Sequence, residues 1–88
     1  MRHAGRDGLD QVEPFLQQLR AIPGLVERKR GVFYRKSKAF LHFHEGPSGL
    51  HADVKLSGHF ERFRVETDEE RAALLARIEQ DGLLRPVP

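Results

Sequence analysis

The chain has 88 residues, of which 39% are apolar and 32% are charged, and its formal net charge is +2 at pH 7. This length predicts one domain with a single modest core, and the apolar content excludes a disordered chain. The absence of cysteine excludes disulfides and thiol chemistry. No apolar run approaches the about 18 residues of a membrane helix, and the charged N-terminus precedes no apolar signal region, so we expect a cytoplasmic protein without membrane contact.

Residues 1–8 lack an apolar pattern and predict a mobile tail before a single domain over residues 9–88. Asp10 with Glu13 three residues later is a capping-box pattern, and helically spaced apolar residues follow it. We therefore expect a helix over residues 11–21, which ends before Pro23 and Gly24. A second helix is expected over residues 68–80, with Thr67 as its N-cap and Glu70 as the capping-box partner.

The middle of the chain predicts antiparallel strands. Residues 32–34 and 39–44 form the first two candidates, with Lys36 and Ser37 as a tight turn between them. Residues 50–56 alternate cleanly between apolar and polar, and residues 59–65 form a possible fourth strand. The predicted fold is a two-layer α+β domain: a helix, a three- or four-stranded antiparallel meander and a second helix, with both helices on one sheet face.

The hydrophobic pattern also predicts the strand register, because a slip of one residue would turn the core face into water. It places His44 opposite His51, and His42 opposite Asp53, on the face without helices. Such a cluster suits zinc or another divalent transition metal. The alternatives are a plain polar sheet face, or a pH-sensitive or anion-binding face, because histidines titrate near neutrality. The metal candidates are His42, His44, His51 and Asp53.

A basic segment with no acid among its eleven residues could contact phosphates. We place two phenylalanines on the open face, where their rings would stack on unpaired bases. The glycines form no phosphate-binding loop and no serine lies in a nucleophile elbow, so the sequence favours no enzyme. The candidate residues for nucleic acid or another anion are Arg28, Lys29, Arg30, Phe33, Arg35, Lys36, Lys38 and Phe40.

The leading hypothesis is therefore a small non-enzymatic binding module without a cofactor, which contacts nucleic acid or an acidic protein surface. The first alternative is a metal-binding domain that uses the histidine and aspartate cluster. The second alternative is self-association as a homo-oligomer through the open sheet face or an edge strand.

Two segments, Ile-Pro-Gly-Leu-Val-Glu at residues 22–27 and Gly-Val-Phe-Tyr-Arg-Lys-Ser-Lys-Ala-Phe at residues 31–40, resemble the opening of MmcQ/YjbR-like proteins. The resemblance covers about half of the chain, which lacks tryptophan and the later strand and helix pattern of that family. It implies an α+β fold with an antiparallel sheet, in a family often labelled DNA-binding without an established mechanism. The His-Phe-His segment at residues 42–44 similarly resembles small domains labelled luciferase-like. Neither resemblance assigns a catalytic residue.

Overall fold

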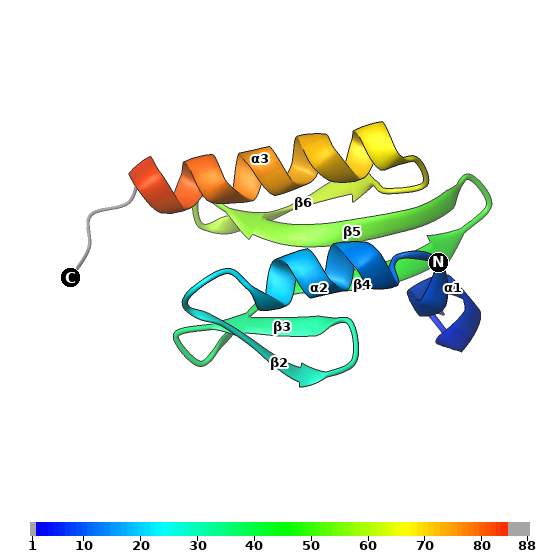
Figure 1. Ribbon diagram of the computed structural model, residues 1–88, viewed down its shortest axis with the longest axis horizontal. Coiled ribbons are helices and arrows are strands. Elements are labelled where there is room, and N and C mark those ends of the chain that lie inside the picture. The colour runs from blue at the N-terminus through cyan, green and yellow to red at the C-terminus, as the bar shows by residue number, and fades with distance from the viewer. Residues whose placement is uncertain (1, 85–88) are drawn as a thin grey trace.

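A computed structural model describes residues 2–84, with the side chains of residues 2–81. The chain forms an α+β domain built on an antiparallel sheet (Figure 1). The elements in chain order are β1 (Arg2–His3), α1 (Arg6–Gln11), α2 (Glu13–Arg20), β2 (Leu25–Lys29), β3 (Val32–Arg35), β4 (Lys38–Gly46), β5 (Gly49–Leu56), β6 (His59–Arg64) and α3 (Asp68–Leu84).

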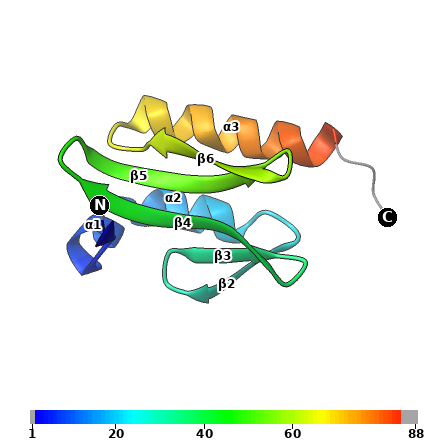
Figure 2. The same cartoon turned by 180° about the vertical axis from the view of Figure 1, so that it is seen from behind.

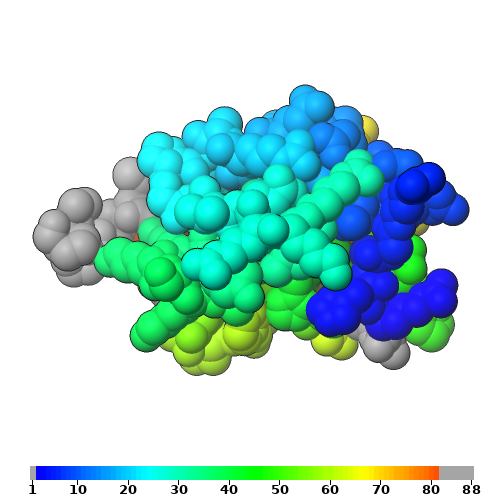
Figure 3. Space-filling model, turned by 90° about the horizontal axis from the view of Figure 1, so that it is seen from below, coloured from blue at the N-terminus to red at the C-terminus, as the bar shows by residue number. Residues whose placement is uncertain are grey.

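Strands β2 to β6 pair in chain order as an antiparallel meander, and β1 pairs with β4 beyond the end of β3. The sheet is therefore larger than expected, because β2 and β1 join the four strands that the sequence predicted. Within residues 1–8, where a tail was expected, residues 2–3 form a strand and α1 begins at Arg6. Figure 3 shows this N-terminal segment lying against the body of the molecule.

A single core joins the sheet to α2 and α3. Figure 1 shows both helices in front of the sheet, and Figure 2 shows the opposite sheet face toward the viewer. Burial of apolar side chains between these elements is the main favourable term in folding. The buried hydrophobic residues are Val12, Phe15, Leu16, Leu19, Phe33, Phe40, Leu41, Phe43, Leu50, Ala52, Val54, Leu56, Val65, Leu74 and Ile78.

The start of the first helical segment differs from the expectation. Asp10 lies inside α1 rather than at an N-cap, and Val12, with ψ of 14°, separates α1 from α2. The two acids of the expected capping box instead bind Arg30, which donates to Asp10 Oδ1 and to Glu13 Oε1 at 2.7 Å each. Asp10 and Glu13 therefore form long-range ion pairs with Arg30 in place of the local capping box.

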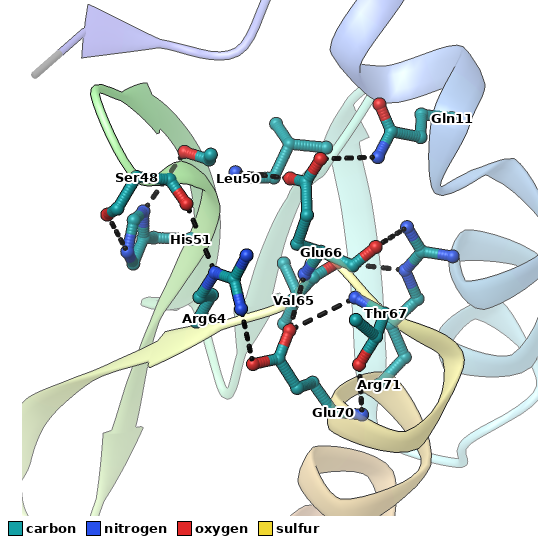
Figure 4. Close-up of polar contacts among 11 residues, drawn as sticks. Gln11, Ser48, Leu50, His51, Arg64, Val65, Glu66, Thr67, Glu70 and Arg71 are labelled. Carbon is teal, nitrogen blue, oxygen red and sulfur yellow. Dashed lines mark hydrogen bonds and ion pairs between the residues drawn. The ribbon is translucent and has the colours of Figure 1, made fainter.

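Two locally encoded features are confirmed. In the capping box of α3, the Glu70 amide donates to Thr67 Oγ1 at 3.1 Å, and the Thr67 amide donates to Glu70 Oε1 at 3.0 Å (Figure 4). In the turn between β3 and β4, Lys36 and Ser37 have φ of 52° and 66°, as a tight turn of two residues requires.

Candidate metal site

The site lies on the sheet face opposite the core, where β4 and β5 pair. His42 is aligned with Asp53, and His44 with His51, so the register inferred from the hydrophobic pattern is confirmed. Successive side chains of a strand point to opposite faces. Because the intervening Phe43 is buried in the core, His42 and His44 project from the other face.

Asp53 is the meeting point of the cluster. Its Oδ2 atom lies 3.1 Å from His44 Nε2 and 3.5 Å from His42 Nε2. One ligand atom from each of the three residues lies within 4.8 Å of the other two. In a tetrahedral zinc site with bonds of about 2.0–2.2 Å, neighbouring ligand atoms are about 3.3–3.6 Å apart. The two spacings at Asp53 therefore match a shared metal ligand sphere with small side-chain movements.

The fourth expected residue, His51, does not join this group. Its Nδ1 atom lies 3.1 Å from the Gly49 carbonyl oxygen, and its Nε2 atom lies 3.2 Å from Ser48 Oγ (Figure 4). With Nδ1 donating to the carbonyl, Nε2 accepts the hydroxyl proton of Ser48. His51 thus holds the turn between β4 and β5, and the structure narrows the predicted cluster from four residues to three.

The structure adds a histidine that the sequence analysis missed. His3 on β1 is aligned with His44, and its ring centroid lies 4.9 Å from that of His44 and 5.7 Å from that of His42. A strand of two residues has no recognisable alternation, so the sequence carried no signal for it. Three imidazoles and one carboxylate therefore share this part of the sheet.

Arg62 from β6 holds the carboxylate of the cluster. Its Nε and Nη2 atoms donate to Asp53 Oδ1 and Oδ2 at 2.7 and 3.0 Å. This pairing holds the pKa of Asp53 below its usual value, because the hydrogen bonds favour the charged carboxylate. Burial, together with the neighbouring His44, lowers the pKa of His42. At neutral pH, Asp53 is thus an anion and His42 a neutral imidazole, which are the protonation states that bind metals.

His44 is the unusual member of the cluster. Both of its ring nitrogens are buried, and within the described residues neither makes a hydrogen bond, although Nε2 lies 3.1 Å from Asp53 Oδ2. A buried polar atom without a partner costs free energy that folding must offset. A ring nitrogen of His44 is therefore available as a metal ligand beside the anionic oxygen of Asp53.

The predicted basic segment is only partly available for binding. Arg30 is paired with Asp10 and Glu13, and Arg35 lies 3.6 Å from Asp81. The Arg28 guanidinium instead lies over the Tyr34 ring, 4.8 Å from its centroid. The remaining members form no ion pair with a described acid and have exposed side chains: Lys29, Lys36 and Lys38.

The two phenylalanines proposed for base stacking are buried, so that interpretation is wrong. Phe33 is 1% exposed and Phe40 is 3% exposed. The cause is a bulge: Tyr34 pairs with Ala39 while Phe33 pairs with Leu41, which leaves Phe40 as the extra residue on β4. Phe33 therefore lies on the core face with Leu41, and neither ring offers a face to a base.

Comparisons with known proteins give no relative from which a function could be carried over. No family model, no curated protein and no solved structure matches the chain. Among the described residues, no helix combines the length and apolar character needed to cross a membrane. The geometry of the site is therefore the basis on which a function can be inferred.

Proposed function

We propose that this chain is a metal-binding domain that holds a divalent transition metal, with zinc as the best fit, through His42, His44 and Asp53. The observation that carries the proposal is His44, whose two buried ring nitrogens lack hydrogen bonds beside a charged carboxylate. A metal ion bound to one of these nitrogens would satisfy that lone pair. It would also hold His42 and His44 against the same oxygen atom of Asp53.

The donor types support a transition metal rather than calcium or magnesium. Imidazole nitrogens suit zinc, copper, iron and nickel, whereas calcium and magnesium prefer oxygen ligands. Three protein ligands leave at least one position for a further ligand. The site would lie on the sheet face away from α2 and α3, which we take as the open face of the domain.

The direct test is a zinc titration of the labelled full chain, followed by NMR and by competition with a chelating indicator. The double variant His42→Ala/His44→Ala should lose about 100-fold or more in zinc affinity, since second-shell changes alone cost about 10–100-fold. His59→Ala is the matched control, because His59 is an exposed histidine outside the cluster. Equal zinc affinity in the wild type and the double variant would exclude the site.

Nucleic-acid binding remains a second candidate, and the observation that favours it is the group of unpaired cations around the turn between β3 and β4. Lys36 and Lys38 are exposed at this turn, with Lys29 exposed on β2. Such contacts would be to phosphates and independent of base sequence. The buried phenylalanines play no part in this version of the hypothesis.

Salt dependence tests this second candidate. For double-stranded DNA, log affinity falls as log salt rises, and the double variant Lys36→Gln/Lys38→Gln should make this slope less steep by about 2. Arg6→Gln is the control, because Arg6 is an exposed cation at the start of α1, and the preceding strand β1 pairs with the opposite end of β4 from this turn. Binding that is absent, or that ignores salt, would refute nucleic-acid contact through these lysines.

A further inference from the structure

The N-terminal strand β1 lies beside the proposed metal site, although about forty residues of the chain separate it from the histidines of β4. His3 on β1 is aligned with His44 on β4, so both side chains lie on the same sheet face. The centroid distance of 4.9 Å between their rings is close to the 4.6 Å between those of His42 and His44. The ring of His3 is therefore already a neighbour of the two histidines in the cluster.

The attachment of β1 to the sheet is slight. The strand has two residues, both with exposed side chains. Arg2 forms an ion pair of 3.5 Å with Glu45. Directly after the strand, the Ala4 amide donates to the Phe43 carbonyl oxygen at 3.1 Å. Because the side chain of Arg2 is 85% exposed, this ion pair contributes little stability. Short segments with few and exposed contacts open at low free-energy cost.

We infer that His3 is a fourth ligand of the same metal ion, and that metal binding closes β1 onto the sheet. This inference rests on the proposed function. His3, His42, His44 and Asp53 would complete a tetrahedral set of three nitrogens and one oxygen. The exposed imidazole of His3 has the freedom to turn toward the ion, whereas His42 and His44 are held by β4. The N-terminal segment would thereby report on occupancy of the site.

Zinc binding and closure of β1 are linked thermodynamically. If β1 opens and closes locally, the factor by which His3 raises zinc affinity equals the factor by which zinc stabilises the closed strand. The Ala4 amide measures closure, because its hydrogen bond to Phe43 breaks when β1 leaves the sheet. Saturating zinc should therefore slow hydrogen exchange at Ala4 by the same factor that His3 contributes to the dissociation constant.

The experiment compares the wild type, His3→Ala and the control His59→Ala as full-length chains with zinc alone. Loss of His3 should weaken zinc binding by about 10–100-fold, and zinc should then no longer slow exchange at Ala4. With cobalt(II) as a spectroscopic probe, His3→Ala should also alter the d–d absorption, because one nitrogen ligand is lost. A purely structural role for His3 would leave that spectrum unchanged.

The two proposals fail in different ways. If the wild type binds zinc and His3→Ala binds it equally well with an unchanged cobalt spectrum, the role of His3 is refuted and the three-residue site stands. If the wild type does not bind zinc, the proposed function fails and the inference fails with it. His3→Ala is expected to fold, since His3 is exposed, and its amide spectrum without metal verifies this directly.

Discussion

Arg62 should compete with the metal, so its removal is expected to strengthen zinc binding. The guanidinium occupies both oxygens of Asp53, with Nη2 3.0 Å from Oδ2. A zinc ion bonded to Oδ2 at about 2 Å, on the side away from Arg62, would lie about 5 Å from this positive charge. The substitution Arg62→Ala removes that repulsion and frees the carboxylate. Asp53 remains ionised at pH 7 without the arginine, because the usual pKa of an aspartate is far lower.

The size of the gain follows from Coulomb's law. A dication and a monocation about 5 Å apart in water repel each other by an amount that corresponds to about 15-fold in binding constant at low ionic strength. Screening over a length of about 8 Å reduces this to about 5-fold at physiological salt. The expected result is therefore a zinc affinity about 5-fold higher than that of the wild type, with a larger gain in low salt.

Isothermal titration with zinc at two salt concentrations measures this gain. Arg64→Ala is the matched control: it removes the same charge from the same strand, and the two arginine side chains have similar exposure, 48% for Arg64 and 50% for Arg62. Arg64 donates to Glu70 and to the Ser48 carbonyl oxygen rather than to Asp53 (Figure 4). If Arg62→Ala lowers zinc affinity, or if Arg64→Ala raises it equally, the placement of the metal at Asp53 is wrong.

Two further predictions concern the stability of the fold. Hydrogen bonds from Arg20 and Arg30 lower the pKa of Glu13 to about 2 from its model-compound value of 4.5. The stability that this carboxylate contributes is thus complete above pH 4.5 and is lost as the pH falls toward 2. Glu13→Gln should flatten the acid limb of a urea denaturation series over this range, and an unchanged limb would contradict the assignment. Leu74→Ala removes a core side chain of α3 that is 1% exposed, and should lower the free energy of unfolding by about 2–5 kcal/mol. Val26→Ala, at a side chain 57% exposed, is the control and should change it by less than about 0.5 kcal/mol.

The sequence alone determined the features that depend on near neighbours in the chain. The alternation of residues 50–56 predicted the pairing of His42 with Asp53, because it is the nearest register that places the apolar side chains of both strands on one face. The spacing between Thr67 and Glu70 predicted the capping box of α3, which is completed within one helical turn. In each case the interacting groups are joined by a short and regular piece of backbone.

Tertiary structure decided the features that depend on distant partners or on a single irregular residue. The bulge at Phe40 turned Phe33 toward the core, although a regular hairpin after the turn at Lys36 and Ser37 would have left Phe33 opposite Phe40. The side chain of His51 hydrogen-bonds to Ser48 and Gly49 in the adjacent turn, so it does not join the cluster that its register position had predicted. Such outcomes depend on competition between several energetically similar contacts.

The approach of His3 to the cluster was likewise decided by tertiary structure. His3 comes from a strand too short to show a pattern, and it meets His44 across a gap of about forty residues in the chain. Arg62, by contrast, reaches Asp53 within the short hairpin of β5 and β6, where the turn at Ser57 and Gly58 aligns the two residues. Only the place where β1 joins the sheet depends on long-range packing, and no local periodicity in the sequence indicates that place. The strand register could therefore be predicted from the sequence, while the full set of groups around Asp53 required the folded chain.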